Sequence, residues 1–188
     1  LTKISTSDGT VVTTIEVGNG PRGLAFDGTY IWVANNIDDT VSKILPTDGT
    51  IVATISVGEA PRRLAFDGSH IWVTNYLDGT VSKISPSRDT IITTTSVGEG
   101  PRGIAFDGTN IWVANTFDDT VTKILASDGT VIATIDVGDG PIEITFDSTH
   151  IWVANYFDDT GSKILGSGNT VVQTVNVGES PSAMVFDG

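Results

Sequence analysis

The stretch Ile31-Trp32-Val33-Ala34-Asn35 decides the fold of this chain, because close copies of it begin at Ile71, Ile111 and Ile151. The copies follow one another at a constant spacing of 40 residues. Each is a short run of β-branched and aromatic residues, which is the composition typical of a β-strand. A fixed period of this length indicates a repeat architecture, so we interpret the chain as a series of equivalent units.

Each unit predicts four strands. In the first unit the apolar runs besides residues 31–35 lie at residues 24–26, 41–45 and 51–57. Asp27-Gly28 and Asp48-Gly49 separate successive runs, and Asp-Gly supplies the positive φ angles that tight hairpin turns need. We therefore expect consecutive antiparallel strands, which we call strands A, B, C and D of each unit.

The period and the strand faces together predict a β-propeller. Four strands in about 40 to 45 residues are the signature of a propeller blade, whereas helical repeats of similar length need long stretches with a period of 3.6. Strand B is apolar on both faces, as expected for a blade that is covered by a neighbour on either side. The predicted fold class is all-β, with four-stranded antiparallel blades and with inter-blade packing of one tryptophan per unit: Trp32, Trp72, Trp112 and Trp152.

Counting from this phase, we expect one propeller domain, or propeller segment, over residues 1–188. It divides into a partial blade at 1–18, complete blades at 19–58, 59–98, 99–138 and 139–178, and the start of a further blade at 179–188. A blade composed from both ends would contain strands A, C and D but no strand B. We therefore expect a segment of a longer protein whose ring has about six to eight blades, the alternative being a five-bladed or intermolecularly completed ring.

Composition excludes several classes of function. With no cysteine, the chain has no disulfide, Cys-ligated zinc or thiol nucleophile. Its 23 acidic and 10 basic residues give a net charge of −13, which disfavours nucleic acid and anionic membrane surfaces as partners. No apolar run approaches the roughly 18 residues of a membrane span, so we expect no membrane insertion.

Residues 20–58, GPRGLAFDGTYIWVANNIDDTVSKILPTDGTIVATISVG, resemble the YVTN family of bacterial and archaeal β-propeller repeats. The chain is similar, more loosely, to the propeller of the streptogramin (virginiamycin B) lyases. The first resemblance implies a secreted or cell-surface propeller, in a family whose members have varied roles. The second implies metal-assisted elimination with a His and carboxylates, although no residue here is matched to those catalytic positions.

In a propeller, the D-to-A and B-to-C loops emerge on one face, which we call the site face. The D-to-A loops are at residues 18–22, 58–62, 98–102, 138–142 and 178–182, and the B-to-C loops are at 35–39, 75–78, 115–119 and 155–159. Tyr76 and Tyr156 are expected to stack on sugar rings there. We also expect the terminal asparagine of each strand B to reach this face: Asn35, Asn75, Asn115 and Asn155.

Arginines stand out in this acidic chain, because they begin the innermost strands at the mouth of the central channel: Arg22, Arg62, Arg63 and Arg102. They are candidates to hold a carboxylate or sulfate group. The alternative is that each pairs with a neighbouring Glu59, Glu99 or aspartate. In the fourth unit Ile142-Glu143 replaces Arg-Gly, and Gly161 replaces a valine; a single site in a symmetric ring, or simple sequence drift, explains this asymmetry.

Paired aspartates in the B-to-C loops are candidate oxygen ligands for Ca²⁺. The alternative is that they cap turns through hydrogen bonds to the backbone, as Asp and Asn at strand ends often do. No other cofactor is expected. The residues concerned are Asp38, Asp39, Asp118, Asp119, Asp158 and Asp159.

Motifs for catalysis are few. Residues 18–23 (GNGPRG) and 98–103 (GEGPRG) match the dinucleotide fingerprint formally, but a proline interrupts each loop and a strand, not a helix, follows. His70 and His150 occupy A-to-B turns on the face opposite the arginines, where we interpret them as solvated turn residues. We therefore expect no catalytic residue.

The sequence thus favours a non-enzymatic extracellular or cell-surface propeller, bacterial or archaeal, that presents its site face to a protein or glycan partner. One alternative is a lyase or hydrolase with its site at the channel mouth. Another is a passive structural array within a larger surface protein. Since fold does not fix function, the three are separated by experiment.

Overall fold

The computed structural model describes residues 1–186, and all regular secondary structure in that range is β-strand. The strands form four four-stranded sheets and one two-stranded sheet, so the prediction of an all-β propeller is confirmed. Their bounds are β1 (Thr2–Ile4), β2 (Val11–Thr14), β3 (Pro21–Phe26), β4 (Ile31–Asn35), β5 (Thr40–Ile44), β6 (Ile51–Ser56), β7 (Pro61–Phe66), β8 (Ile71–Asn75), β9 (Thr80–Ser85), β10 (Thr90–Ser96), β11 (Pro101–Phe106), β12 (Asn110–Asn115), β13 (Thr120–Leu125), β14 (Val131–Asp136), β15 (Pro141–Phe146), β16 (His150–Asn155), β17 (Thr160–Leu165) and β18 (Thr170–Asn176).

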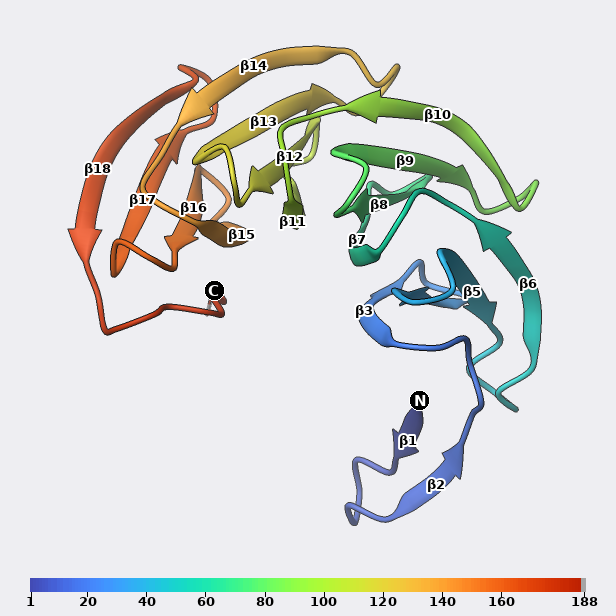
Figure 1. The fold of residues 1–188 in the computed structure, drawn as a ribbon. Helices are drawn as coiled ribbons and strands as arrows, with labels where there is room; N and C mark the ends of the chain where they lie inside the picture. The colour runs from blue at the N-terminus through green and yellow to red at the C-terminus, as the bar shows by residue number, and fades with distance from the viewer. Residues whose placement is uncertain (187–188) are drawn as a thin grey trace.

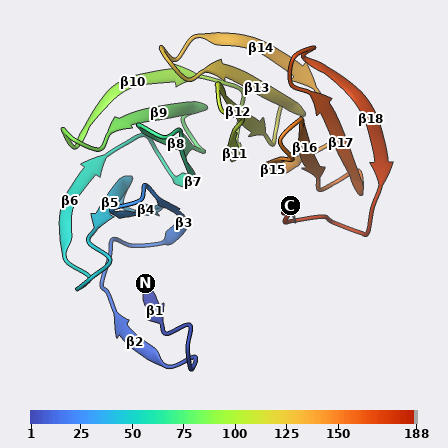
Figure 2. The ribbon, with the colours of Figure 1, turned by 180° about the vertical axis from the view of Figure 1, so that it is seen from behind.

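Each complete blade is an antiparallel meander in the order A, B, C, D. The A strands β3, β7, β11 and β15 lie innermost, and the D strands β6, β10, β14 and β18 form the outer rim of the arc (Figure 1). The pair β1–β2 stands beside the first complete blade, as the same arc seen from behind also shows (Figure 2). The inner strands of neighbouring blades therefore run side by side around one central space.

The last segment departs from expectation. Residues 181–186 align with strand A of the complete blades, and a fifth strand A was expected there, but they form no strand. The physical reason is that a strand needs a hydrogen-bonded neighbour, and no strand B pairs with this segment. The segment instead turns back toward the central space after β18 (Figure 1).

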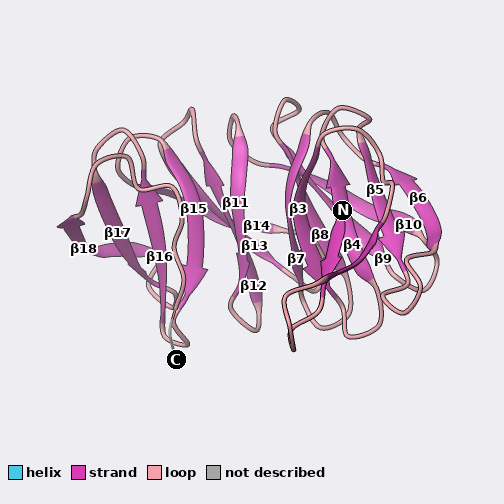
Figure 3. Cartoon of the chain, turned by 90° about the horizontal axis from the view of Figure 1, so that it is seen from below, coloured by secondary structure: helices cyan, strands magenta, loops and turns pink. Residues whose placement is uncertain are grey.

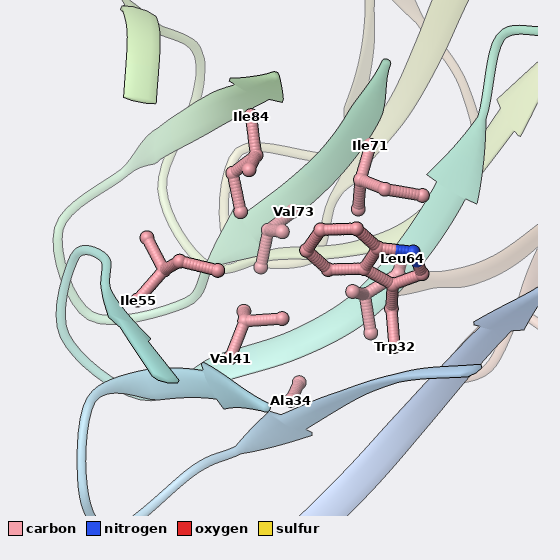
Figure 4. Close-up of a cluster of buried hydrophobic side chains, with 8 residues drawn as sticks. All are labelled: Trp32, Ala34, Val41, Ile55, Leu64, Ile71, Val73 and Ile84. Carbon is pink, nitrogen blue, oxygen red and sulfur yellow. The ribbon is translucent and has the colours of Figure 1, made fainter. Parts of the chain in front are cut away.

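Three of the four predicted tryptophans pack blades together, whereas Trp152 of the last complete blade is only partly buried. Trp32 of β4 is fully buried and projects into the next blade, where it contacts Leu64, Ile71 and Ile84 (Figure 4). Trp72 and Trp112 repeat this packing in the two following junctions. A buried aromatic side chain of this size is a large apolar contribution to each junction.

An aspartate in each A-to-B turn fixes the tryptophan. Asp107 Oδ1 accepts hydrogen bonds from the backbone N–H groups of Thr109 and Asn110, and its Oδ2 accepts one from Trp112 Nε1 at 2.7 Å. The same bond to the indole recurs in every complete blade, from Asp27, Asp67, Asp107 and Asp147. Each Asp-Gly or Asp-Ser turn thus closes a hairpin and also satisfies the only polar atom of an indole ring that is buried or, in Trp152, partly buried.

The lysine of each of the first three complete blades donates a hydrogen bond to the next blade, whereas Lys163 of the fourth lies over the Trp152 ring of its own blade, 4.9 Å from the centroid. Lys83 Nζ donates to the carbonyl oxygen of Ala126 in the next blade at 2.6 Å and lies 5.1 Å from the ring centroid of Trp72. Lys43 and Lys123 do the same toward Pro86 and Gly166. The lysine ammonium groups are therefore engaged in contacts within the protein.

The junction between β1–β2 and the first complete blade differs from the inner junctions. Lys3 still donates to the Pro46 carbonyl oxygen at 2.8 Å, but no tryptophan enters this junction. Leu24 is consequently 53% exposed, whereas Leu64, its equivalent in the next blade, is 8% exposed. Among the described residues there is also no helix long and apolar enough to cross a membrane.

Candidate functional site

The site face contains the loops that connect strand D to strand A and strand B to strand C. The strands run between two edges of the arc, and loops emerge at both (Figure 3). The two sets of loops are hydrogen-bonded to each other within each blade, as when Asn36 N–H donates to the Gly20 carbonyl oxygen at 3.0 Å and Ile37 N–H to that of Asn19 at 3.2 Å. The expected site-face loops are therefore brought together.

Four arginines gather at the centre of this face, on the first residues of β3, β7 and β11. Burial lowers the pKa of Arg62, and the positive charges of Arg102, Arg22 and Arg63 lower it further, while the nearby Tyr76 opposes them. The guanidinium of Arg62 stacks on the Tyr76 ring at 3.7 Å from its centroid. We call Arg22, Arg62, Arg63 and Arg102 the arginine cluster, which the sequence predicted as a group.

The arginine cluster is largely unneutralised. Arg63 Nη2 forms an ion pair with Glu143 Oε2 at 3.0 Å, bridging the second and fourth complete blades. Within residues 1–186, no salt bridge joins Arg22, Arg62 or Arg102 to a carboxylate, so the alternative that Glu59 and Glu99 neutralise them is wrong. Arg62 Nε is moreover buried without a hydrogen-bond partner.

Glycine explains why the ion pair joins alternate blades. Strands β3, β7, β11 and β15 carry Gly23, Arg63, Gly103 and Glu143 at equivalent positions. A Cβ on Gly103 would lie 2.9 Å from the Cα of Glu143, and one on Gly23 would collide with the Arg62 carbonyl oxygen. The glycines thus let neighbouring inner strands approach closely, and the side chains of Arg63 and Glu143 meet past Gly103, which lies on β11 between them.

The expectation that the strand-B asparagines reach the site face is wrong. Asn35, Asn75, Asn115 and Asn155 are fully buried. Asn35 Nδ2 donates to Thr40 Oγ1 at 3.0 Å and to Ser42 Oγ at 2.9 Å, which ties the end of strand B to strand C. Gly18 covers the amide so closely that a Cβ there would lie 2.6 Å from Asn35 Cγ. These side chains shape the loops from beneath and are closed to a ligand.

The paired aspartates act as caps within and between blades. Asp118 Oδ2 accepts the backbone N–H of Glu99 at 2.8 Å, and Asp119 Oδ1 accepts that of Gly140 in the next blade, also at 2.8 Å. Asp38, Asp39, Asp158 and Asp159 make the corresponding bonds. Within residues 1–186, no three His, Asp or Glu side chains are grouped as a candidate metal site, and the observed bonds are those of the capping alternative.

The aromatic residues of the site face are arranged differently from the expectation for sugar stacking. One face of Tyr76 is covered by Arg62, and Tyr156 packs edge-on against Phe157 with ring centroids 5.2 Å apart. The exposed apolar side chains are instead those at the third position of each B-to-C loop, which the sequence interpretation passed over: Ile37, Leu77, Phe117 and Phe157. Their recurrence at one loop position every 40 residues was the available signal.

The histidines lie on the face opposite the arginine cluster, as expected, but both are partly buried: His70 directly precedes β8, and His150 is the first residue of β16. His70 Nδ1 lies 3.5 Å from Asp67 Oδ2, and His150 Nδ1 lies 3.6 Å from Asp147 Oδ2. Both aspartates also accept a hydrogen bond from a tryptophan indole. Each histidine therefore lies beside the turn that positions the tryptophan ring.

No family model and no curated protein matches the sequence. Solved structures do match: a hydrazine synthase from Kuenenia stuttgartiensis (20% identity, TM-score 0.79, covering 94% of this chain and 53% of that one) and a functionally unknown protein from Desulfotomaculum acetoxidans (18%, 0.85, 96% and 63%). Virginiamycin B lyase from Staphylococcus aureus also matches (18%, 0.83, 100% and 67%). At these identities the similarity establishes the β-propeller fold alone. The chain spans about half to two thirds of the length of these structures.

Proposed function

We propose that this chain is the non-enzymatic binding module of an extracellular or cell-surface protein, and that its site face holds a carboxylate or sulfate group of a protein or glycan partner. The observation that carries the proposal is the arginine cluster: four guanidinium groups accompanied by one ion-paired carboxylate, in a chain of net charge −13.

Electrostatics favours an anion at this place. An acidic surface repels anionic ligands in general, so a local excess of positive charge directs them to one region. Arg62 is half-buried and its guanidinium is fixed against Tyr76, which strengthens a charge-assisted hydrogen bond and reduces the ordering needed on binding. Three of the four arginines have no competing salt bridge within residues 1–186.

The setting in a secreted or surface protein of bacteria or archaea rests on the resemblance of the 40-residue unit to YVTN repeats, and we propose that the units are of that kind. Acidity and the absence of cysteine fit this setting. If the arginines contribute nothing to binding, the chain is instead interpreted as a purely structural array.

The test measures binding of polyglutamate, polygalacturonate and chondroitin sulfate by calorimetry, at low and at physiological ionic strength. Arg62→Ala should weaken binding about tenfold, the equivalent of one charge-assisted contact. Arg88→Ala is the matched control, because Arg88 is an exposed arginine in the C-to-D turn between β9 and β10. Equal losses in both variants would mean that net charge alone governs binding and would refute the proposal.

A lyase or hydrolase acting at the channel mouth is the second candidate, favoured by the match of the whole chain to virginiamycin B lyase. Its difficulty is the lack of a base at the arginine cluster: Glu143 is ion-paired, and both histidines lie on the opposite face. Turnover of streptogramins or acidic glycans with added Mg²⁺ tests it, and product formation that survives purification and is lost in Glu143→Gln would establish it over the binding module.

A further inference from the structure

A row of exposed apolar side chains follows the arc of blades on the same face as the arginine cluster. Its members occupy the same position of each B-to-C loop, and their exposed fractions are 71% for Ile37, 67% for Leu77, 59% for Phe117 and 67% for Phe157. We call these four residues the apolar rim. A scattered exposed leucine is ordinary, but large apolar residues repeated at the tips of four loops on one face mark an interaction surface.

The apolar rim is held in place by the backbone beneath it. Phe117 N–H donates to the Glu99 carbonyl oxygen at 3.2 Å, and Phe157 N–H donates to that of Asp139 at 3.1 Å. Gly100 lies directly under Phe117, where a Cβ would come within 2.6 Å of the ring. Because the loops are fixed before a partner arrives, binding costs little conformational entropy.

The apolar rim is continuous with the arginine cluster. The Arg62 guanidinium stacks on the Tyr76 ring, and the Tyr76 ring lies 5.6 Å from the Phe117 ring, centroid to centroid. Asn36, next to Ile37, donates from Nδ2 to the Pro61 carbonyl oxygen of the following blade at 3.2 Å. The face therefore combines a cationic centre with an apolar periphery in one surface.

Building on the proposed function, we propose that the partner is a protein, bound through an acidic segment whose carboxylates enter the arginine cluster while its apolar side chains pack on the apolar rim. The ion pair between Arg63 and Glu143 shows that the cluster accommodates a protein carboxylate at 3.0 Å. A segment that presents Asp or Glu together with Leu or Phe satisfies both parts of the surface.

The rim composition favours a protein over a glycan. Ile37 and Leu77 have no flat ring on which a sugar could stack, and a sugar placed over them would lose the hydration of its hydroxyl groups without a replacement. An extended anionic membrane is disfavoured as well, because it would cover the whole face and meet Glu59, Glu99 and Asp139 in the loops beside the rim together with the arginine cluster. A peptide segment can place its carboxylates at the cluster and only apolar side chains beside those acidic residues.

The experiment compares four probes on the whole chain by fluorescence anisotropy and calorimetry. They are a peptide of alternating Glu and Leu, a peptide of equal length with Ser in place of Leu, a chondroitin sulfate oligosaccharide of equal charge, and phosphatidylcholine vesicles containing phosphatidylglycerol. The Glu/Leu peptide should bind about tenfold more tightly than the Glu/Ser peptide, since two or three apolar contacts are added.

Two double variants test whether the tighter binding of the Glu/Leu peptide depends on the apolar rim. Phe117→Ser with Phe157→Ser should abolish the advantage of the Glu/Leu peptide and leave binding of the Glu/Ser peptide unchanged. Val52→Ser with Ile132→Ser is the control, because both residues are 45% exposed but lie on the outer strands β6 and β14. Thermal unfolding and near-ultraviolet circular dichroism establish that each variant is folded.

Equal affinity for the two peptides, tighter binding of chondroitin sulfate, or vesicle binding that depends on the rim phenylalanines would each overturn the assignment of an acidic protein segment. Those outcomes leave the proposed function standing if Arg62→Ala still weakens binding of the Glu/Ser peptide. Loss of the rim effect and an unchanged Arg62→Ala variant together would refute both.

Discussion

The two faces of this propeller use repeated polar residues in opposite ways. On the face formed by the A-to-B and C-to-D turns, Asp107, Trp112 and Lys123 form a closed set in which the carboxylate holds the indole and the ammonium reaches the next blade. On the site face, the arginine cluster retains three cations without a salt bridge among the described residues. Repetition alone therefore does not distinguish structure from function, whereas charge that is left without a salt bridge does.

Within the site face the same criterion separates residues that the sequence treats alike. The strand-B asparagines and the paired aspartates recur as regularly as the rim residues, yet their side chains bond to the protein itself. The arginines, in contrast, do not recur in every blade. The position occupied by Arg22, Arg62 and Arg102 in the first three complete blades is Ile142 in the fourth. The arginine charges that have no salt bridge within residues 1–186 therefore lie at positions where the four blades differ in sequence.

Breaking the closed set on the turn face should have the largest effect. Trp112→Ala removes a fully buried ring between two blades and leaves Asp107 without its indole donor, so it should lower the free energy of unfolding by about 3–5 kcal/mol. Phe117→Ala, which removes a ring 59% exposed on the site face, should change the free energy of unfolding by about 0.5 kcal/mol. Urea unfolding measures both, and similar losses would contradict the contrast between the faces.

The fold was predictable because period, turn residues and two-sided apolar strands all indicate one architecture. Residues such as Asp27-Gly28 and Trp32 constrain backbone and packing locally, and the same constraint recurs in every unit. The segment at 181–186 was mispredicted because strand formation depends on a neighbour, which a local pattern does not contain. The grouping of the arginines followed from topology, since the A strands converge at the centre.

The candidate site was less predictable where side-chain direction decides the outcome. Asn35 ends a strand and was expected to point outward, but two hydroxyl acceptors in strand C and the adjacent Gly18 draw its amide inward. The ion pair between Arg63 and Glu143 joins residues 80 positions apart, and the spacing of two nonadjacent blades around a centre is a property of the assembled arc. Sequence periodicity describes the features that the blades share, and it does not predict contacts between nonadjacent blades.

Lowering the pH is a second way to destabilise the hydrogen bonds of the turn face. We expect the loss in the free energy of unfolding to be smaller than that of Trp112→Ala. Burial acts to raise the pKa of Asp147, but hydrogen bonds from the Trp152 indole and from His150 and Thr149 N–H, with the charge of His150, lower it to about 2. Because the folded pKa lies below the value of 3.8 for the free group, ionised Asp147 stabilises the fold above about pH 4. That stabilisation is lost as the pH falls from about 4 to about 2.

Asp147→Asn isolates this contribution. The variant should be less stable than the parent at pH 5, and its urea midpoint should fall less between pH 5 and pH 2.5, since one depressed carboxyl has been removed. Asp136→Asn, at an exposed position at the end of β14, is the control and should retain most of the parental pH dependence. An Asp147→Asn variant with the full parental decline would place the acid sensitivity elsewhere.

A gain in stability, smaller than the loss expected for Trp112→Ala, sharpens the comparison from the site face. Gly79 occupies the position at which Asp39, Asp119 and Asp159 cap a backbone N–H of the next blade, and it has the same left-handed conformation, with φ +61° against +55° for each aspartate. Gly79→Asp should therefore supply the missing acceptor for Gly100 N–H. A Cβ there would lie 3.4 Å from the Gly98 carbonyl oxygen, which is a tolerable contact.

The expected gain is about 0.5–1 kcal/mol in the free energy of unfolding, because a hydrogen bond to a charged group contributes about 1.5–3 kcal/mol and the left-handed conformation of a non-glycine residue costs about 1–2 kcal/mol. Gly79→Ala carries the same backbone cost without the carboxylate, so the difference between the two variants in urea unfolding isolates the cap. If Gly79→Asp proved no more stable than Gly79→Ala, the aspartates of the other blades could not be regarded as structural caps. Their carboxylates would then have to be reconsidered, together with the arginine cluster, as part of the binding surface.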